Sequence, residues 1–332
     1  MQKLYLVIGG SGFVGQHLVR ALLAAGCAVR VFDQKPLTDG LPVEFMAGDL
    51  RDPAAVQRAC AGAHTVFHAA SLVDWRAGSR ALLHAVNVTG TRHVLAACSA
   101  QPGTRLVYTS SIDVVFDGRP IPNGDERLSY ARRHLDDYGH SKMLAEREVL
   151  AANGHNGLAT CALRLAGVYG PGDAHRLPAV VALARQGRMV RIGDGQARFN
   201  HVYVENAAYA HCLAAERLAA GAPVAGSAYF IIDHPPRNFF DFVSAFPQAM
   251  GLPAAQRVLS SRVAYALALL LEGWAYLTRS RKVALTRYIV ASTCRDFYFS
   301  GAKAARELGY QPPVSEAEAF SRTLEWLNSL GG

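Results

Sequence analysis

Short apolar runs alternate with longer segments of helical periodicity through the first half of the chain. The helical segments cover residues 12–25, 52–61 and 78–100. Strands that alternate with helices of this length are typical of a parallel sheet covered on both faces. We therefore predict an α/β fold with a doubly wound parallel sheet. The runs expected to form strands are LYLVIG (4–9), VRVFD (29–33), VEFMAG (43–48), HTVFHAA (64–70) and RLVYTSS (105–111).

One later segment, VAYALALLLEGWAYL at 263–277, is apolar nearly all round and is followed by the cationic TRSRK. It is shorter than the roughly 20 residues that span a bilayer, and Glu272 interrupts it. Two interpretations remain open. The segment is a buried core or dimer helix, or it is an interfacial helix that holds Trp274 and Tyr276 at headgroup level. The second interpretation gives residues 263–282 a peripheral membrane contact.

Composition narrows the class of protein without identifying it. Of the 332 residues, 51% are hydrophobic and 18% are charged, which is typical of a folded chain with a sizeable core. The formal net charge is +8, but the cations are dispersed except near residues 279–287, and we expect no nucleic-acid partner. Six cysteines without a CxxC pair predict reduced thiols and no metal site. The chain opens directly into a strand and glycine loop, and we expect a cytoplasmic protein.

The sequence GGSGFVG follows the first expected strand and opens the first expected helix. This is the context in which a glycine loop holds a dinucleotide, because the helix N-terminus meets the pyrophosphate charge. Gly9 permits the tight turn, Gly12 lets the backbone approach the phosphates, and Gly15 allows close packing of helix on strand. A tight turn without a ligand is the alternative. The pattern predicts a Rossmann-type domain with a cofactor site at Gly9, Ser11, Gly12, Phe13, Val14 and Gly15.

Asp33 ends the second expected strand, where a carboxylate accepts hydrogen bonds from the adenosine ribose and repels a 2′-phosphate. NAD is therefore favoured as the cofactor. Lys35 keeps NADP open, because a cation at this place accommodates that phosphate. The fourth expected strand ends in small residues, Ala69 and Ala70, that leave room for the cofactor. His68 precedes them and is included in the expected site, with a hydrogen-bonded core histidine as the alternative.

Tyr138 and Lys142 lie four residues apart, on one face of the helix expected over 138–153. An unperturbed tyrosine titrates near 10, whereas proton exchange with a substrate oxygen needs a group that titrates closer to neutrality. A neighbouring ammonium and the positive charge of an oxidised nicotinamide favour the phenolate and lower the tyrosine pKa. Lys142 also offers three donors to ribose hydroxyls. We predict that this pair carries out proton transfer, with a solvated helix face as the alternative.

The fifth expected strand ends in Thr109, Ser110 and Ser111. Binding residues of open α/β sheets lie at the carboxyl ends of the strands. We predict that Ser111 binds the reacting oxygen and that Thr109 lies beside the cofactor. Two adjacent serines leave the register open, and a loop serine that satisfies backbone groups is the alternative.

The alternation loosens from about residue 166, where turn sequences such as YGPGD and DHPP become frequent. We predict a NAD-binding Rossmann domain over 1–165, to which 200–232 return. Residues 166–199 and 233–332 then form a smaller substrate-binding region that contains the apolar helix 263–277.

These motifs together resemble the extended short-chain dehydrogenases/reductases, and the later segments resemble the 3β-hydroxysteroid dehydrogenase/isomerase family over nearly the whole chain. The resemblance lies in LRLAGVYGPGD (163–173) and RFNHVYVENAAYAHCLAA (198–215). The segment AARELGYQPPVS (304–315) also resembles the branch of the family with sterol-4α-carboxylate 3-dehydrogenases. The family resemblance implies that Asp49 and Leu50 hold the adenine and that Asn87 has a supporting role in the cofactor site. It also implies that Leu165, in place of the usual proline, and Val168 lie on the nicotinamide side.

The branch with sterol-4α-carboxylate 3-dehydrogenases is most similar, and it implies oxidation of a sterol 3β-hydroxyl followed by decarboxylation. Ser111, Tyr138 and Lys142 then form the catalytic group, and a sterol or other lipid-like molecule is the substrate. Two other enzyme activities stay open, a 3β-hydroxysteroid dehydrogenase/isomerase and a reductase of long-chain 2-alkyl-3-keto acids. A non-catalytic dinucleotide sensor is the alternative of another class. Related dehydrogenases imply a homodimer that pairs helices 78–100 and 138–153.

Overall fold

A seven-stranded parallel sheet forms the centre of the protein in a computed structural model, which describes residues 3–74, 79–174, 176–253, 255, 257–278, 283 and 285–331. The strand order is β12-β7-β5-β4-β1-β2-β3. This order reverses direction beside β1, as in doubly wound Rossmann sheets, and confirms the predicted fold class. The strands are β1 (Leu4–Ile8), β2 (Ala28–Asp33), β3 (Glu44–Ala47), β4 (Thr65–His68), β5 (Arg105–Ser111), β7 (Ala159–Leu165) and β12 (Ser227–Ile231).

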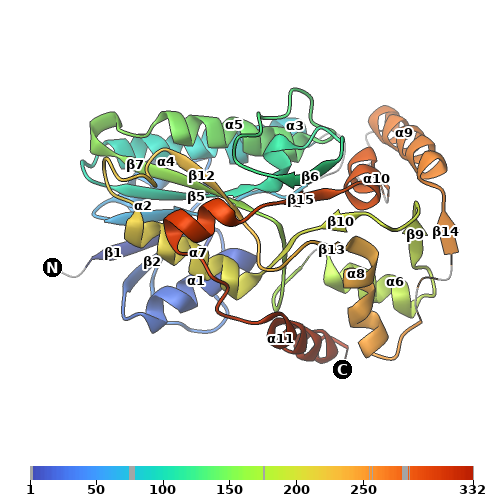
Figure 1. The fold of residues 1–332 in the computed structure, drawn as a ribbon. Coiled ribbons are helices and arrows are strands. Elements are labelled where there is room, and N and C mark those ends of the chain that lie inside the picture. The colour runs from blue at the N-terminus through green and yellow to red at the C-terminus, as the bar shows by residue number, and fades with distance from the viewer. Residues whose placement is uncertain are drawn as a thin grey trace.

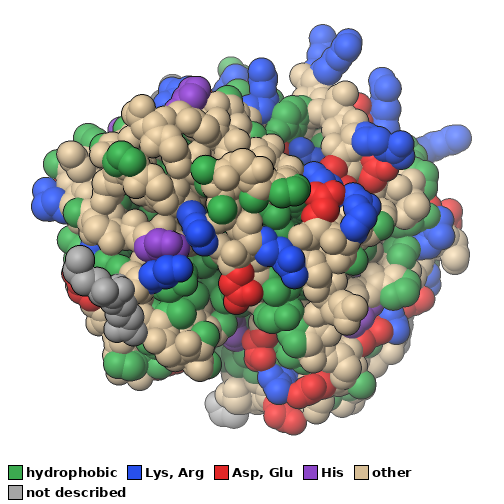
Figure 2. All heavy atoms as spheres, turned by 60° about the vertical axis from the view of Figure 1, so that its left-hand side comes forward, with side chains coloured by type: hydrophobic (Ala, Val, Ile, Leu, Met, Phe, Trp, Pro, Cys, Tyr) green, Lys and Arg blue, Asp and Glu red, His purple; other side chains and the backbone are tan. Residues whose placement is uncertain are grey.

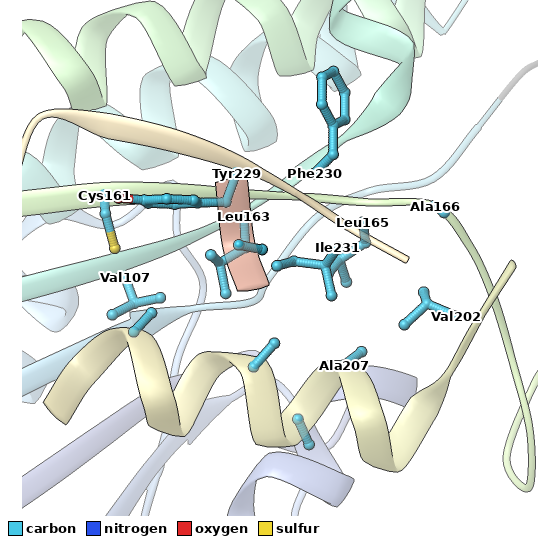
Figure 3. Close-up of a cluster of buried hydrophobic side chains, with 14 of the residues drawn as sticks. Val107, Cys161, Leu163, Leu165, Ala166, Val202, Ala207, Tyr229, Phe230 and Ile231 are labelled. Carbon is cyan, nitrogen blue, oxygen red and sulfur yellow. The ribbon is translucent and has the colours of Figure 1, made fainter. Parts of the chain in front are cut away.

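Helices cover both faces of this sheet (Figure 1). Every residue of β4 and β7 is buried as a result, which explains why these runs are apolar without alternation. Figure 3 shows one of the two interfaces, where Leu163 and Ile231 point from the sheet toward α7 while Phe230 points to the opposite face. One face carries α1 (Phe13–Ala24) and α7 (Val204–Arg217), and the other carries α2 (Pro53–Cys60), α4 (Gly90–Ser99) and α5 (Asp137–Ala151).

The helix expected over 78–100 is interrupted by a wider turn. It consists of α3 (Arg80–Leu83), the π-helical segment η1 (His84–Thr89) and α4, which follow one another without a break. Insertions of this kind inside helices occur frequently at functional sites. Here the π-helical segment contains Asn87.

A second layer of elements lies beyond the carboxyl ends of the parallel strands (Figure 1). It contains a mixed sheet of β13 (Arg237–Asn238), β10 (Arg198–Phe199), β15 (Phe297–Phe299) and β6 (Ile121–Gly124). Two strand pairs are β11 (His201–Tyr203) with β8 (Gly167–Tyr169), and β14 (Arg257–Leu259) with β9 (Val190–Ile192). The helices are α6 (Leu177–Arg185), α8 (Phe239–Ala249), α9 (Ser261–Thr278), α10 (Arg287–Cys294) and α11 (Glu316–Ser329). Short helical turns are η2 (Ile112–Val115), η3 (His155–Gly157) and η4 (Ala304–Leu308).

Helix α7 and strand β12 come from residues 204–231, after the chain has already entered the second layer. Because β12 joins the seven-stranded sheet and α7 covers it, the chain crosses between this sheet and the second layer more than once. We keep the division into a NAD-binding domain (1–165 with 200–232) and a substrate-binding region (166–199 and 233–332) as a proposal.

The apolar segment 263–277 forms most of α9, which lies at the edge of the molecule (Figure 1). The helix buries only a stripe of alanines, and its large side chains are exposed, with Leu270 70%, Trp274 67% and Leu277 79% accessible. The expectation of a helix buried in the core of this chain is therefore wrong. No helix in the described part of the chain is long and apolar enough to cross a membrane. The cationic residues 279–282 lie outside the described residues.

Figure 2 shows one face of the molecule in space-filling form. On this face Lys and Arg side chains are spread among acidic and polar groups and form no continuous stripe. A nucleic-acid backbone is bound by clustered basic side chains. The distribution on this face has no such feature.

Candidate active site

A cavity of about 1060 Å³ lies where the carboxyl ends of the parallel strands meet the second layer. The sequence-predicted residues that line it are Gly9, Ser11, Gly12, Phe13, Val14, Gly15, Asp33, Asp49, Leu50, Ala69, Ala70, Thr109, Ser111, Tyr138, Lys142, Leu165 and Val168. The structure thus brings together residues that are spread from Gly9 to Val168, over nearly half of the chain. Two predicted residues, His68 and Asn87, are not part of this lining.

The glycine loop approaches its neighbours so closely that side chains would not fit. Gly9 has a φ of +82°, and a Cβ atom on it would lie 2.5 Å from the Cα atom of Ala70. A Cβ atom on Gly15 would lie 2.0 Å from the carbonyl oxygen of Gly9. These contacts agree with the roles expected of the two glycines in the turn and in helix packing. Helix α1 begins after Gly12 without a side-chain cap, so its first N–H groups are available to an anion.

Two carboxylates, those of Asp33 and Asp49, line the outer end of the cavity. Asp33 accepts hydrogen bonds from the backbone N–H groups of Ser11 and Gln34, at 3.0 and 2.7 Å, and so joins the end of β2 to the glycine loop. Asp49 pairs with Arg51, with 2.6 Å between Oδ2 and Nη2, and this guanidinium lowers the pKa of the Asp49 carboxyl. Both carboxylates therefore face a polar, charged surrounding that suits a ribose and its base.

His68 and Asn87 support the cavity from behind its wall. His68 is buried, its Nε2 lies 2.9 Å from Thr91 Oγ1, and burial lowers its pKa to about 3, so the ring is neutral. Asn87 accepts from the N–H of Leu72 at 2.8 Å and donates to its carbonyl at 3.0 Å and to Ser141 Oγ at 2.9 Å. Asn87 thereby fixes the loop after β4 to α5.

Tyr138 and Lys142 lie in the first turns of α5 and are both buried. The helix begins here because the carboxylate of Asp136 accepts from the N–H of Gly139 at 2.7 Å. The Lys142 ammonium donates to the carbonyl of Thr109 at 2.5 Å and lies 4.3 Å from the centre of the Tyr108 ring. Burial lowers the pKa of Lys142 to about 7, although the charge of Glu146 acts in the opposite direction.

The pKa of the Tyr138 phenol is raised in the protein alone. Burial is the largest cause, the charges of Asp113 and Asp136 add to it, and hydrogen bonds with Ser111 and Ser71 lower the pKa in part. The sequence predicts a lowered pKa from Lys142 and a nicotinamide cation together. Because burial weakens the ammonium as well, the protein's own groups do not produce that shift, and the prediction rests on the charge of the cofactor.

Ser111 and Ser110 point into different surroundings. The Ser111 hydroxyl donates to Asp113 Oδ2 at 2.8 Å, whereas the Ser110 hydroxyl donates to the buried carboxylate of Glu146. Glu146 also forms an ion pair with Arg164, at 2.7 Å between Oε1 and Nη2. The hydrogen bond between Ser111 and Tyr138 places Ser111, of the two serines, beside the phenol.

Asp113 and Tyr288 are site residues that the sequence reasoning missed. Both line the cavity, and the Tyr288 hydroxyl donates to Asp113 Oδ1 at 2.7 Å. Asp113 follows Ser111 by two positions, so its place in TSSID was a usable signal. Tyr288 lies in α10, 175 residues further along the chain, and no local pattern marks it.

The inner end of the cavity is mostly apolar. Its wall is supplied by α6, α8, α10 and the strands beside them, so it belongs to the second layer. A large hydrophobic ligand matches such a wall. The apolar lining residues here are Val168, Ala179, Val180, Leu183, Phe199, Phe239 and Ile289.

The sequence profile of the 3-beta hydroxysteroid dehydrogenase/isomerase family matches residues 6–261, which cover the glycine loop, the Tyr138–Lys142 pair and most of the cavity wall. The chain belongs to this family. As a family member it is an oxidoreductase of the short-chain dehydrogenase type, so the alternative of a dinucleotide sensor is wrong.

Curated relatives of this dehydrogenase family cover nearly the whole chain. The 2-alkyl-3-oxoalkanoate reductase of Stenotrophomonas maltophilia is 39% identical over 96% of this chain and 97% of its own. The sterol-4-alpha-carboxylate 3-dehydrogenase (decarboxylating) of Mus musculus is 36% identical over 98% of this chain and 91% of its own. The crystal structure of the protein gox2253 has the same fold, with a TM-score of 0.80, 26% identity and 99% coverage of both chains.

Proposed function

We propose that this enzyme uses NAD to oxidise the 3β-hydroxyl of a 4-carboxysterol to a 3-ketone, after which the product loses carbon dioxide. The observation that carries the proposal is the position of Ser111, Tyr138 and Lys142. These residues lie on the wall of one cavity, between a glycine loop and an apolar inner end. A nicotinamide cofactor and a hydrophobic alcohol therefore have room to meet at the tyrosine hydroxyl.

The residues present fit a dinucleotide. The uncapped N-terminus of α1 suits a pyrophosphate, and the absence of a side chain at Gly12 lets phosphates approach the backbone. Asp33 suits ribose hydroxyls and so favours NAD, while Lys35, which also lines the cavity, keeps NADP open. When bound, oxidised nicotinamide supplies the acceptor for the hydride.

The protein's own groups handle the proton. Tyr138 accepts the hydroxyl proton of the substrate as the hydride leaves the adjacent carbon, and Ser111 holds the substrate oxygen. Lys142 orients the ribose and stabilises the phenolate. Because the site is buried, these charges act over short distances with little screening by water.

The product of this oxidation is a β-keto acid. When its carboxylate leaves as carbon dioxide, the electron pair of the broken carbon–carbon bond passes into an enolate, which then takes up a proton. The mouse relative is named as a decarboxylating dehydrogenase of such a substrate. The Stenotrophomonas relative favours a second candidate, reduction of a long-chain 2-alkyl-3-oxo acid. Both substrates carry a carboxylate on the carbon next to the reacting one.

The proposal is tested by following NADH formation with a 4-carboxysterol, a plain 3β-hydroxysteroid and a long-chain 2-alkyl-3-hydroxy acid in parallel. We expect the 4-carboxysterol to give NADH and an equal amount of carbon dioxide. Oxidation of the hydroxy acid alone would support the second candidate instead. Turnover of the plain hydroxysteroid alone, or of none of the three compounds, would contradict both candidate functions.

We also propose that α9 rests on the surface of a lipid bilayer on its cytoplasmic side. Leu270, Trp274 and Leu277 are exposed on one helix, and the sequence continues into the cationic TRSRK, which complements anionic lipids. Helix α9 packs on α10, and α10 lines the inner end of the cavity. A sterol-like substrate would thus enter close to the membrane that dissolves it.

We further propose that the protein forms a homodimer through α4 and α5. These helices lie together on one face of the sheet, and an ion pair between Arg92 and Glu148 joins them at 2.6 Å. A second copy related by a two-fold axis would pack the same helices against each other.

A further inference from the structure

Arg176 is a cavity-lining cation that no described carboxylate approaches within ion-pair distance. It precedes the first turn of α6, and its Nη2 donates to the carbonyls of Gly167 and Val168 at 3.1 and 3.2 Å. Its Nε atom is buried and has no hydrogen-bond partner, and its guanidinium forms no ion pair with any residue in the described part of the chain. The nearby carboxylate of Asp173 accepts from the N–H groups of Arg176 and Leu177, both at 3.0 Å, and so caps α6.

The guanidinium lies at the substrate end of the cavity. A Cβ atom on Gly167 would lie 2.4 Å from Arg176 Nη1 and 2.6 Å from Phe199, so the missing side chain at Gly167 makes room for both groups. The phenol of Tyr288, which hydrogen-bonds Asp113, acts on the charge of Arg176. Arg176 is thus next to the aromatic inner wall and is connected to the surroundings of Ser111 through Tyr288 and Asp113.

The nearest carboxylate, Asp173, acts on the charge of Arg176 but forms no ion pair with it, because its oxygens accept from the backbone at the start of α6. A partly desolvated guanidinium in this position gains free energy when an anion pairs with it in good geometry. Its planar fork of donors matches the two oxygens of a carboxylate, as it does those of a phosphate. Of these two groups, both candidate substrates carry the carboxylate. Burial already lowers the pKa of Arg176, which is the electrostatic sign that the charge lacks solvation. Arg176 therefore keeps a donor, Nε, and a charge that a negatively charged ligand group would satisfy.

We propose that Arg176 binds the carboxylate of the substrate and so selects hydroxy acids over neutral hydroxysteroids. This inference rests on the proposed function, because it assigns a binding partner to the carboxylate that both candidate substrates carry. The cofactor's pyrophosphate is the other anion within the cavity, but its expected place is the N-terminus of α1, whereas Arg176 lies against Gly167 and Phe199.

The test compares Arg176→Gln with the wild type. Glutamine removes the charge but keeps an amide donor for the backbone carbonyls. The matched control is Arg185→Gln, because Arg185 lies at the exposed end of the same helix. We measure kcat/KM for a 2-alkyl-3-hydroxy acid and for a neutral 3β-hydroxysteroid, and the Kd of NADH from its fluorescence. The preference for the acid should fall at least about tenfold in Arg176→Gln, as expected when charge-assisted hydrogen bonds are lost. It should not change in Arg185→Gln.

A loss of the same size on both substrates would overturn the proposal. A weakened Kd for NADH with an unchanged preference would assign the cation to the pyrophosphate instead. Melting temperatures show whether each variant folds, and Arg176→Lys, which keeps the charge, should keep part of the preference even if the glutamine variant is unstable. A preference that Arg176→Lys lost completely while folded would also contradict a charge-based role.

Calorimetry of the NADH complex with tetradecanoate and with tetradecan-1-ol separates this inference from the proposed reaction. We expect the wild type to bind the carboxylate more tightly than the alcohol and Arg176→Gln to lose this difference. If the difference is present but no hydroxy acid is oxidised, the proposed function fails and the assignment of Arg176 stands. If hydroxy acids are oxidised but the difference is absent, the assignment fails.

Discussion

Burial governs the chemistry of the individual site residues. Lys142 and Tyr138 both lose solvation in their charged forms, so the pKa of the ammonium falls to about 7 and that of the phenol rises. The charge of Glu146 raises the pKa of Lys142 and so opposes the effect of burial, since Glu146 lies one turn beyond Lys142 on α5. The charge of Asp113 adds to the rise in the pKa of Tyr138, because its carboxylate is close to the phenol. In the proposed mechanism the Tyr138 phenolate therefore depends on the positive charge of the bound oxidised nicotinamide.

We predict that Tyr138→Phe loses at least about a hundredfold in kcat, the low end of general acid–base effects. The affinity for NADH should stay within a factor of about two, since the phenol is not needed to hold the pyrophosphate or the ribose. Stopped-flow turnover and NADH fluorescence measure the two quantities.

Tyr209→Phe is the control, because this tyrosine is exposed on α7 and its hydroxyl is remote from the cavity lining. Normal turnover by Tyr138→Phe would remove the tyrosine from the mechanism. A variant that lost NADH binding and turnover together would indicate a structural role.

At the scale of elements, α9 differs from a usual surface helix, which buries its large apolar side chains. Its small residues, Ala264, Ala268 and Ala275, are buried, whereas large apolar side chains lie outside. The buried alanines share one face of the helix, so helical spacing is kept, but the face that packs on α10 consists of small residues instead of large apolar ones. An exposed apolar face of this kind marks an interaction surface.

We predict that a variant with Leu270→Ser, Trp274→Ser and Leu277→Ser binds vesicles of phosphatidylcholine and phosphatidylglycerol at least about tenfold more weakly than the wild type. The three side chains would otherwise each bury apolar area worth roughly 1.5–3 kcal/mol. Sedimentation with the vesicles measures the partition.

Leu330→Ser serves as the matched control, because it removes an exposed leucine near the other end of the second layer. Equal sedimentation of wild type and triple variant would show that α9 is not the membrane contact. If the wild type did not sediment with the vesicles, α9 would likewise be excluded as a membrane contact.

At the scale of the whole molecule, the site exists because two layers meet. The parallel sheet and its helices supply the glycine loop, Asp33 and the proposed catalytic group, and the second layer supplies Arg176, Tyr288 and the apolar wall. The face of the sheet opposite to α1 and α7 carries α4 and α5, and the exposed positions of these two helices are available to a second copy.

We predict a particle of twice the chain mass of 35.7 kDa in light scattering after size exclusion. Ala96→Glu, on an exposed position of α4, should shift the particle to the monomer mass, because it buries a charge in the proposed interface. Ala182→Glu, exposed on α6, should not. A monomer mass for the wild type, or a dimer that both variants leave intact, would contradict this interface.

The sequence predicts the first part of the fold closely and the second part poorly. The run RLVYTSS coincides with β5 at both ends, and VRVFD lacks only the first residue of β2. The wide turn at η1 and the short strands β8, β10 and β13 have no such signature, because two or three residues do not form a hydrophobic period. Their conformations follow from packing against elements that come from elsewhere in the chain.

Local patterns in the sequence were enough to predict the glycine loop, the Tyr138–Lys142 pair and the doubly wound sheet. Each is encoded within a few positions, by glycine spacing, by the helical turn or by an apolar run, and local geometry fixes what it does. Only the three-dimensional packing shows that Asp113 meets Tyr288, that Arg176 lines the cavity without an ion pair to a described residue, and that α9 is exposed. Those properties depend on burial and on contacts between segments distant in sequence, which no local pattern records.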